Sequence, residues 1–227
     1  MLSLILPTLN EAKNISILIP EINNSLRGIR HEIIVVDDNS SDNTPELAEK
    51  YPNVRVIRRT ERGLSSAILA GFAAARGDIL GVMDSDRSHP AGSIIKALGE
   101  MKDYDIVILS RKINGGRISD WSRIRRLISN AAIMLAKPIT HYRDPVSGYF
   151  FMRRDTLQGL KIRPIGYKIL LDILFQARQA RVKEIPYTFS DRAAGRSKLT
   201  IKVISCYIWQ VLRIYKKLIQ RTAAGHT

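Results

Sequence analysis

Short apolar segments alternate with helical patterns over the first half of the chain, and this alternation constrains the fold more than any other feature. The apolar segments span 2–6, 32–37, 54–57, 79–83 and 105–109, and the helical patterns span 14–25, 45–51, 64–75 and 90–101. Strands that alternate with helices form βαβ units, in which the strands run parallel. The sequence therefore predicts an α/β fold with a mostly parallel, Rossmann-like sheet flanked by helices.

Each of four predicted strands is followed by a polar loop. The loops PTLNE, DDNSSDNT, DSDRSHP and SRKINGG lie at 7–11, 37–44, 84–90 and 110–116. In open parallel sheets, ligands bind beyond the carboxyl ends of the strands. We expect the four loops to meet at one edge of the sheet and to form the functional site there.

The loop DSDRSHP presents two carboxylates, Asp84 and Asp86, one residue apart at the end of a strand. Because side chains two apart in an extended chain point the same way, both carboxylates would face one side. Such oxygen ligands suit a hard divalent cation such as Mg²⁺ or Mn²⁺. A simple turn is the alternative, since Asp and Ser are common in turns. The convergence of four polar loops favours the metal site.

The other loops offer further carboxylates and a cation. Asp37 and Asp38 end a buried strand, where a carboxylate can accept hydrogen bonds from a ribose or base, or can form an Asx turn. Glu11 can likewise contact a nucleotide or cap the helix that follows it. Arg111 precedes the flexible NGG at 114–116, where it can bind a phosphate or remain a solvated surface charge.

The chain of 227 residues has 36 Lys and Arg against 21 Asp and Glu, a formal net charge of +15. The excess lies mainly between Arg111 and Arg126 and from Arg192 onward, where no acid occurs. Such charge suits an anionic partner: a phosphorylated substrate, acidic lipid or nucleic acid. Nucleic acid is disfavoured because zinc-finger and RNA-binding aromatic signatures are absent and only 7% of residues are aromatic.

The sequence shows no targeting segment. The N-terminal MLSLILPTLNEAKN has no basic stretch before its apolar residues, and we interpret it as a first strand, not a signal peptide. No apolar run reaches the roughly 18 residues of a membrane-spanning helix. The single cysteine, Cys206, excludes an internal disulfide and is consistent with a reducing, intracellular setting.

Taken together, the motifs resemble those of the family-2 glycosyltransferases with the GT-A fold, in particular the dolichyl-phosphate mannose synthases and other polyprenyl-phosphate glycosyltransferases. LPTLNEAKNI, VVDDNSSDNT, MDSDRSHP and SRKINGG are similar to the family's opening, nucleotide, metal and acceptor motifs. GLSSAILAGFAAARGD at 63–78 is similar to its Gly-rich helix. RRLIS (125–129), DPVSGYFFMRR (144–154) and DRAAGRSKL (191–199) follow in the same order, so the resemblance covers about residues 2–199.

The resemblance implies roles for individual residues. The nucleotide sugar would be bound by Pro7, Glu11, Val36, Asp38, Asp84, Ser85, Arg192 and Lys198. The lipid phosphate would be bound by Arg111, Arg125 and Ser129. Asp86 would be the main ligand of Mg²⁺ or Mn²⁺, with Asp84 and Ser88 assisting. Asp86, Arg111 and Arg125 would therefore be the residues that carry the reaction.

Three features depart from the family pattern. Leu9 stands where Tyr is usual, which removes a base-stacking contact. Arg87 replaces a Leu beside the metal loop, and Leu170 and Asp172 lie near positions where Gln and Glu are common. The implied reaction is inverting transfer of mannose from GDP-mannose to a polyprenyl or dolichyl monophosphate. Transfer of glucose or another hexose from a UDP-sugar is the alternative.

A phosphate acceptor simplifies the chemistry that the residues must perform. Its second pKa is about 6, so at neutral pH it is largely ionised and needs no general base. The tasks left to the enzyme are orientation and charge stabilisation. His89, beside Pro90, is interpreted as a turn residue. A phosphohydrolase with a nucleophilic Asp in VMDSD is a distant rival, because such a motif usually opens the chain.

The segment LTIKVISCYIWQVLRIYKKLIQR at 199–221 has a helical pattern. Its polar stripe consists of Lys202, Ser205, Arg213, Lys216 and Gln220. The apolar face is wider than the roughly 100° that a surface helix needs. The helix therefore either docks in a groove of its own domain or lies in a membrane interface with anionic lipid. We expect a glycosyltransferase domain over 1–199, an amphipathic helix over 200–221 and a tail over 222–227.

The expected partners are a nucleotide-sugar donor, a polyprenyl phosphate and a membrane surface, without nucleic acid. A peripheral protein on the cytoplasmic face of a membrane would meet both substrates. A small membrane-protein partner or a homo-oligomer is left open.

Overall fold

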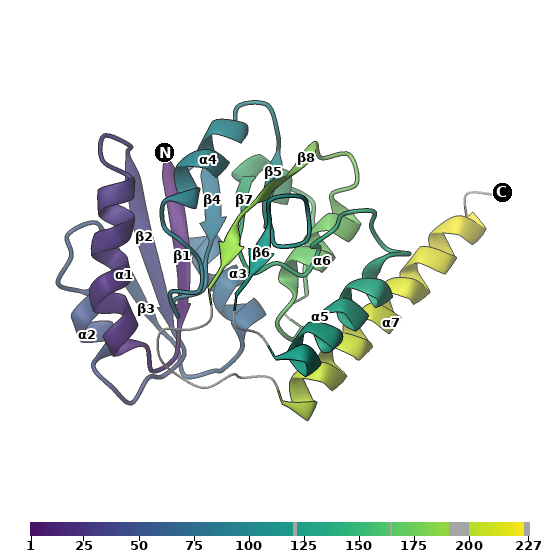
Figure 1. The fold of residues 1–227 in the computed structure, drawn as a ribbon, viewed down its shortest axis with the longest axis horizontal. Helices are drawn as coiled ribbons and strands as arrows, with labels where there is room; N and C mark the ends of the chain where they lie inside the picture. The colour runs from purple at the N-terminus through teal and green to yellow at the C-terminus, as the bar shows by residue number, and fades with distance from the viewer. Residues whose placement is uncertain (120–121, 164, 191–199, 225–227) are drawn as a thin grey trace.

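The computed structural model describes residues 1–119, 122–163, 165–190 and 200–224 (Figure 1). The main sheet contains β1 (Leu2–Thr8), β2 (His31–Asp37), β3 (Val54–Arg58), β4 (Ile79–Val82), β5 (Ile106–Ser110), β7 (Phe150–Arg153) and β8 (Val182–Pro186). A small second sheet pairs β6 (Arg117–Ile118) with β9 (Thr188–Phe189). The helices are α1 (Ala12–Ser25), α2 (Thr44–Ala48), α3 (Leu64–Ala74), α4 (Ser93–Glu100), α5 (Arg123–Ala136), η1 (Arg154–Leu157), α6 (Ile169–Gln176) and α7 (Ile201–Ala224).

The main sheet has the strand order β3-β2-β1-β4-β7-β5-β8. Its neighbouring strands are parallel except β7, which runs antiparallel to both β4 and β5. The predicted α/β fold with a mostly parallel sheet is confirmed. The reversal of β7 was not predicted, because a short apolar run such as FFMR carries no local signal of strand direction.

The two faces of the main sheet carry separate hydrophobic cores, which explains why the strands are apolar without a break. In β1, Leu4 and Leu6 pack with α1 and α4, whereas Ile5 between them packs on the opposite face. That face is covered by α3 and α6, which contribute Phe72 and Ile173. The parallel strands thus stay fixed between two helical layers, and their loops emerge at one edge.

A third core joins α7 to α5 and α6, beside the sheet (Figure 1). Its buried side chains are Ile133, Ala136, Ile139, Val146, Leu171, Phe175, Tyr207, Val211 and Ile214. The hydroxyl of Tyr207 donates to the Ala132 carbonyl at 2.5 Å, and that of Tyr215 donates to the Leu135 carbonyl at 2.6 Å. One face of α7 therefore docks on its own domain. None of the described helices is long and apolar enough to cross a membrane.

The α5–α7 pair also exposes apolar side chains that the third core does not use. On α7 these are Ile204, Ile208, Trp209, Leu212 and Ile219, and on α5 they are Ile124, Leu127, Met134 and Leu135. Ile204, Ile208 and Leu212 repeat every four residues and so form one strip along the helix. The wide apolar face of the C-terminal helix thus divides into a docked strip and an exposed strip.

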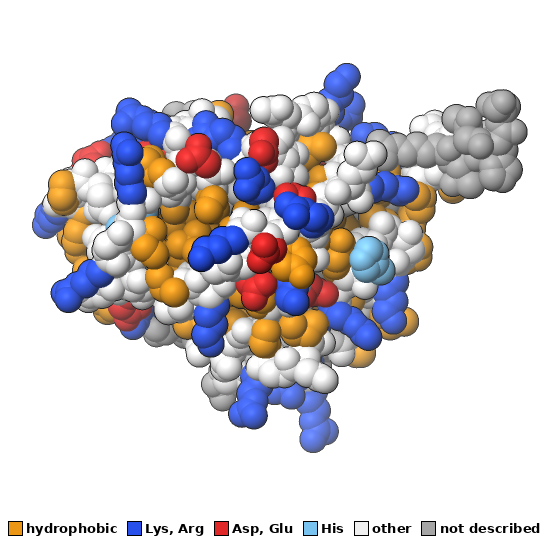
Figure 2. Space-filling model, turned by 90° about the horizontal axis from the view of Figure 1, so that it is seen from above, with side chains coloured by type: hydrophobic (Ala, Val, Ile, Leu, Met, Phe, Trp, Pro, Cys, Tyr) orange, Lys and Arg blue, Asp and Glu red, His pale blue; other side chains and the backbone are white. Residues whose placement is uncertain are grey.

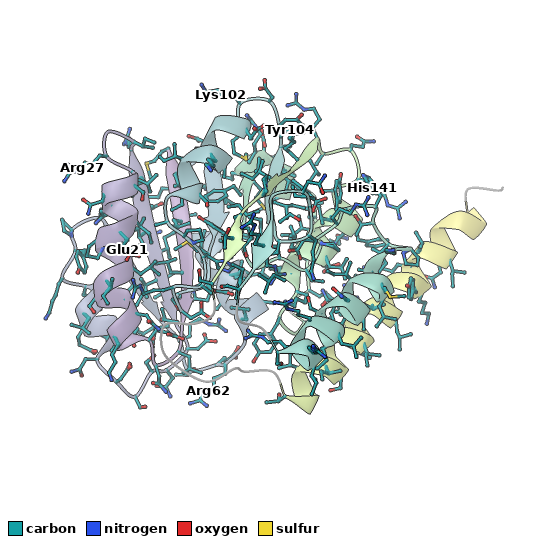
Figure 3. All side chains as sticks on the ribbon, viewed as in Figure 1. Glu21, Arg27, Arg62, Lys102, Tyr104 and His141 are labelled. Carbon is teal, nitrogen blue, oxygen red and sulfur yellow. The ribbon has the colours of Figure 1, made fainter. Side chains whose placement is uncertain are left out.

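The polar loops follow the carboxyl ends of the parallel strands, and the amino ends of these strands lie at the opposite edge of the sheet. Figure 2 shows the edge at the amino ends of the parallel strands, where acidic and basic side chains are interspersed with hydrophobic ones. Arg27 and Lys102 lie toward this edge, whereas Arg62 lies at the opposite edge, among the loops that follow the strands (Figure 3). The candidate site is at the edge near Arg62.

Candidate functional site

The polar loops after the strands are bonded to one another. The Ser41 amide donates to Asn10 Oδ1 at 2.8 Å, which joins the second loop to the first. The hydroxyl of Ser85 donates to the Pro7 carbonyl at 2.8 Å, which joins the third loop to the first. The predicted convergence is confirmed for these three loops. Pro7 and Val36, both predicted to line the nucleotide, are register partners at the ends of β1 and β2.

Asp38 lies where the second loop meets the start of α3. Its Oδ2 accepts a hydrogen bond from the Gly63 amide at 2.7 Å, and its Oδ1 pairs with Arg59 Nη1 at 3.1 Å. Asp37, in contrast, accepts bonds from the Thr8 hydroxyl at 2.8 Å and the Ser40 amide at 2.8 Å. Asp37 thus orders the loop, as the turn alternative requires. Arg59 was missed because nothing in its local pattern links it to a carboxylate 21 residues earlier.

Glu11 occupies the N-cap position of α1, but its side chain does not accept a capping hydrogen bond from the helix backbone. Its Oε2 accepts from the Asn14 amide group at 2.7 Å, and its own amide donates to the Thr44 hydroxyl at 2.9 Å. Glu11 therefore lies at the junction of the first two loops, and its contact with a nucleotide stays a prediction.

Asp86 is almost fully buried in the metal loop. Its Oδ1 accepts hydrogen bonds from the Ser88 amide at 3.1 Å and the Ser88 hydroxyl at 2.5 Å. The two residues that resemble metal ligands are thus in direct contact, and Ser88 orients the carboxylate of Asp86. Their binding of a metal stays a prediction.

Arg87 departs from the family pattern, and the structure explains how it is accommodated. Its guanidinium Nη2 lies 2.9 Å from Glu21 Oε1 on α1, so its charge is paired outside the metal loop. Its backbone φ of 62° lies in the left-handed region, which is uncommon for a residue with a long side chain. The left-handed turn directs the side chain toward α1 while its neighbours remain in the loop.

Arg111 is buried and is not a solvated surface charge. Its guanidinium forms two bonds with Asp144, from Nε to Oδ2 at 2.8 Å and from Nη2 to Oδ1 at 2.9 Å. It also lies 5.6 Å from the centre of the Phe189 ring. Burial disfavours its charge, but Asp144 and, more weakly, Asp84 raise the pKa of Arg111 above its usual value. The acceptor loop is therefore tied to the segment before β7 through Asp144.

Lys168, at the start of α6, is a further cation near the Arg111–Asp144 pair. Its Nζ donates to the Val146 carbonyl at 3.1 Å. Burial and the charge of Arg111 lower the pKa of Lys168, although Asp84 and Asp144 act in the opposite direction. Lys168 was not predicted as a site residue, because GYKILLDILFQAR is typical of an ordinary helix start. The only available signal was a lysine directly before an apolar helix.

Arg125 and Ser129 lie four residues apart on one face of α5 and are partly exposed. The Ser122 hydroxyl caps the helix by accepting from the Arg125 amide at 3.3 Å. The helix begins with a cluster of basic residues near the acceptor loop. Arg192 and Lys198, predicted to close over the donor, lie outside the described residues.

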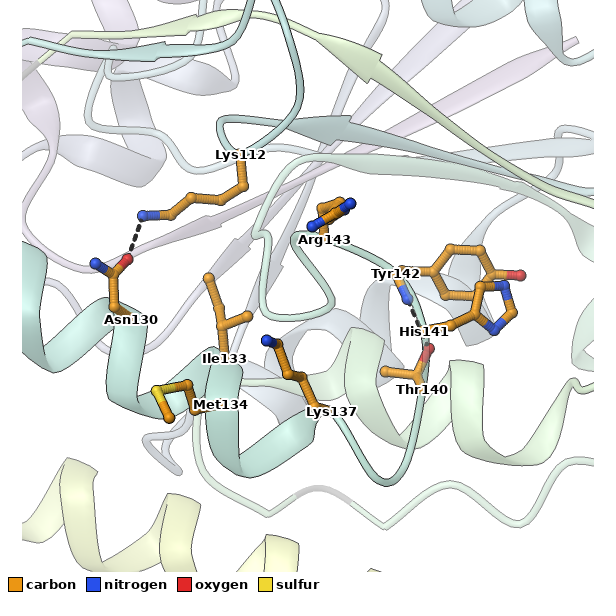
Figure 4. A pocket seen from close by; sticks show the side chains of 9 residues that line it. All are labelled: Lys112, Asn130, Ile133, Met134, Lys137, Thr140, His141, Tyr142 and Arg143. Carbon is orange, nitrogen blue, oxygen red and sulfur yellow. Dashed lines mark hydrogen bonds between the residues drawn. The ribbon is translucent and has the colours of Figure 1, made fainter.

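A pocket of about 480 Å³ opens beside the acceptor loop (Figure 4). It is lined by Lys112, Asn130, Ile133, Met134, Lys137, Thr140, His141, Tyr142 and Arg143. The Nζ of Lys112 donates to Asn130 Oδ1 at 2.8 Å and so links the acceptor loop to α5. The pocket thus combines cationic groups with an apolar wall from α5.

The chemistry of the metal loop fits a divalent cation. Asp84 and Asp86 both present carboxylate oxygens, and Mg²⁺ is usually bound by one or two carboxylates together with phosphate oxygens. Such oxygens also suit Mn²⁺. Within the described part of the chain, no group of three or more His, Cys, Asp or Glu side chains is placed to hold a metal. The donor set suits a cation that a diphosphate helps to bind.

Comparison with known proteins identifies the family. The model of Glycosyl transferase family 2 matches residues 3–160. This chain belongs to glycosyltransferase family 2. It is 45% identical to a dolichol-phosphate mannosyltransferase of Pyrococcus furiosus over 94% of this chain, but it spans only 63% of that relative. The predicted family is confirmed, and with it the assignment of the chain as a glycosyltransferase.

Two further family members extend the comparison. The dolichol-phosphate mannosyltransferase of Saccharomyces cerevisiae is 41% identical over 81% of this chain and 74% of its own length. The undecaprenyl-phosphate mannosyltransferase of Micrococcus luteus is 32% identical over 92% of this chain and 91% of its own length. The relatives thus share mannose and a polyprenyl phosphate in their names but differ in the polyprenol.

A solved structure supports the fold. Glucosyl-3-phosphoglycerate synthase from Mycobacterium tuberculosis, in complex with Mn²⁺, uridine diphosphate and glucosyl-3-phosphoglycerate, superimposes with a TM-score of 0.71. The two proteins are 22% identical, and the match covers 95% of this chain and 78% of that one. The predicted GT-A fold is confirmed by this likeness.

Proposed function

We propose that this chain transfers mannose from GDP-mannose to a polyprenyl monophosphate, with inversion at the anomeric carbon. The observation that carries the proposal is that segment 144–148 contacts both loops: Asp144 bonds Arg111 of the acceptor loop, and Gly148 lies against the Asp84 carboxylate of the metal loop. A carboxylate site and a cationic site are thus held at one edge of the sheet. The mannosyltransferase relatives supply the choice of sugar and acceptor.

The donor would lie across the first three loops. Asp38 and Glu11 would contact the nucleotide, together with Pro7 and Val36 at the ends of β1 and β2. Asp84, Ser85 and Asp86 would face the diphosphate. A divalent cation bound by Asp86 and Asp84 supplies positive charge at the leaving group. Arg192 and Lys198 are proposed to close over the donor.

The acceptor phosphate would be positioned by the cations of the acceptor loop and α5. Arg125 and Ser129 present adjacent groups on α5, and Arg111 is held rigid by Asp144, so little ordering is needed on binding. An ionised phosphate monoester attacks without a general base. The protein therefore acts by alignment of two anionic substrates and by neutralising their charge.

The exposed apolar strips of α5 and α7 are proposed to rest on a membrane surface. Trp209 lies on the exposed face of α7, and amphipathic helices with aromatic and basic residues bind at the headgroup level. A polyprenyl tail stays in the bilayer, so this placement would bring its phosphate to α5. The amphipathic helix over 200–221 is proposed to belong to the membrane-facing surface, next to a glycosyltransferase domain over 1–199.

A donor panel tests the function. Purified protein with polyprenyl phosphate and Mn²⁺ or Mg²⁺ is offered labelled GDP-mannose, UDP-glucose and UDP-N-acetylglucosamine. We expect label in the lipid phase with GDP-mannose, and none with the Asp86→Ala variant. Preferential labelling from UDP-glucose would favour the alternative donor. Release of free phosphate without a glycolipid would instead support a phosphohydrolase.

A further inference from the structure

His89 lies in a closed aromatic environment behind the metal loop. Its side chain is 2% exposed. Its ring centre lies 4.8 Å from that of Tyr149 and 5.5 Å from those of Tyr187 and Phe189. The interpretation of His89 as a turn residue does not explain this burial, because a turn residue needs no such enclosure.

Both ring nitrogens of His89 have polar partners. Nδ1 lies 3.0 Å from the hydroxyl oxygen of Tyr187, and Nε2 lies 3.4 Å from Oδ2 of Asp84. Tyr187 comes from the segment between β8 and β9, 98 residues further along the chain. A continuous set of contacts therefore runs from the segment between β8 and β9 through the imidazole to a carboxylate of the metal loop.

The chemistry of the three groups sets the direction of their hydrogen bonds. An ionised carboxylate only accepts, so Nε2 must carry a proton toward Asp84. Burial raises the pKa of Tyr187 well above its usual value, so its hydroxyl keeps its proton and can donate to Nδ1. Tyr187 and Asp84 together fix the orientation of the imidazole ring. Such outer contacts orient metal-binding groups in many proteins.

The Asp84 carboxylate also lies against the backbone of Gly148. A Cβ placed on Gly148 would lie 3.1 Å from Oδ2 and 3.4 Å from Oδ1 of Asp84. The glycine thus allows the carboxylate to lie close against the backbone. Asp84 is therefore confined by both Gly148 and His89, while 34% of its side chain is exposed.

We propose that His89 is a positioning residue, oriented by Tyr187, that holds the Asp84 carboxylate in the orientation needed to bind a divalent cation and a diphosphate. The inference rests on the proposed function, because it assigns Asp84 to the donor site. His89 would act through its contact with Asp84.

Two substitutions separate positioning from simple packing. In His89→Gln the side-chain amide nitrogen can take the place of Nε2 and donate to Asp84. In His89→Asn the shorter amide occupies the place of Nδ1 and reaches Tyr187 but not Asp84. Both replace the ring with a smaller amide, so they lose comparable packing. They differ in the contact on which the proposal depends.

The experiment measures Mn²⁺ binding by electron paramagnetic resonance in the presence of GDP, together with thermal unfolding of each variant. We expect His89→Asn to weaken Mn²⁺ binding by roughly 10–100-fold, the usual effect of losing such an outer contact. His89→Gln should recover most of this loss. Tyr187→Phe should show an intermediate loss, because it frees the imidazole to change tautomer or rotate.

The kinetic readout should follow the same order. We expect the KM for the nucleotide sugar to rise in His89→Asn, with the KM for polyprenyl phosphate unchanged. Equal Mn²⁺ affinities in His89→Asn and His89→Gln at equal thermal stability would overturn the proposal, as would wild-type Mn²⁺ affinity in both. The Mn²⁺ and GDP measurements need no acceptor, so failure of the proposed transfer reaction would be distinguished from failure of this inference.

Discussion

Arg111 and Asp144 form a buried, two-bond ion pair that connects the acceptor loop to the segment before β7. The carboxylate of Asp144 is fully buried, and the guanidinium of Arg111 is 8% exposed. Two parallel N–H to oxygen bonds fix both groups more firmly than a single contact would. The pair therefore holds the acceptor loop in place as well as presenting a positive charge near the metal loop.

Removal of Asp144 should destabilise the fold strongly. Asp144→Ala leaves the charge of Arg111 buried without this partner, and we expect a loss of about 3–5 kcal/mol in the free energy of unfolding. Urea denaturation measures the change. Asp105→Ala, which breaks the pair with the solvent-exposed Arg181, is the matched control and should cost much less because solvent screens it. Similar losses in both variants would contradict the structural role given to Asp144.

The same pair should make stability depend on pH. Burial alone would raise the pKa of Asp144, but the charge and hydrogen bonds of Arg111 outweigh it and hold the pKa below the usual 3.8. A carboxyl with a lowered pKa stabilises the fold above its unfolded value and loses this contribution as pH falls through its folded value. Between about pH 5 and pH 2, the stability of the wild type should therefore fall more steeply than that of Asp144→Asn. Parallel profiles would show that another group is responsible.

Substitutions of the two metal-loop carboxylates should affect sugar transfer and nucleotide binding differently. Asp86→Ala should abolish transfer, and Asp84→Ala should weaken binding of the donor nucleotide, because each removes a carboxylate from the proposed cation and diphosphate site. Transfer of labelled sugar and calorimetry with GDP and Mn²⁺ measure the two effects. Full activity of Asp86→Ala, or activity that persists in EDTA, would exclude a metal-held diphosphate.

Arg125 tests the acceptor side. Arg125→Ala should raise the KM for polyprenyl phosphate roughly tenfold to a hundredfold, equivalent to about 1.5–3 kcal/mol for a lost charge-assisted bond. Nucleotide affinity should stay unchanged. Arg126→Ala, on the next position of α5, controls for the general loss of charge. Arg111 is unsuited to this comparison, because its removal also leaves Asp144 buried without its partner. A matching fall in GDP affinity would place Arg125 in the donor site.

The exposed strip of α7 should contribute to membrane binding. Truncation of the helix is a poor test, because it would expose the buried Leu171 and Phe175 of the third core. The double substitution Trp209→Ser and Leu212→Ser instead changes side chains that are 55% and 59% exposed. We expect reduced sedimentation with anionic liposomes and unchanged thermal stability. Ile17→Ser, at an exposed position of α1, should have no effect. Undiminished sedimentation of the double variant would exclude this strip as the contact.

The sequence alone determined the elements and loops of the first half of the protein. The apolar segments and helical patterns lie within a few residues of β1 to β5 and α1 to α4, because periodicity is a local property. It also predicted that the four loops at 7–11, 37–44, 84–90 and 110–116 would meet, since parallel strands present their carboxyl ends together. The motif order was sufficient to predict the family.

Only the tertiary structure decided which distant groups meet. The partner of Arg111 at Asp144, the contact of His89 with Tyr187 and the pairing of Arg213 with Asp172 each join segments that are far apart along the chain. Only the tertiary structure decided the direction of β7 and the division of α7 into docked and exposed strips. These features depend on how the sheet order brings separate segments together. Burial then strengthens each polar pairing, because water no longer competes for the polar groups.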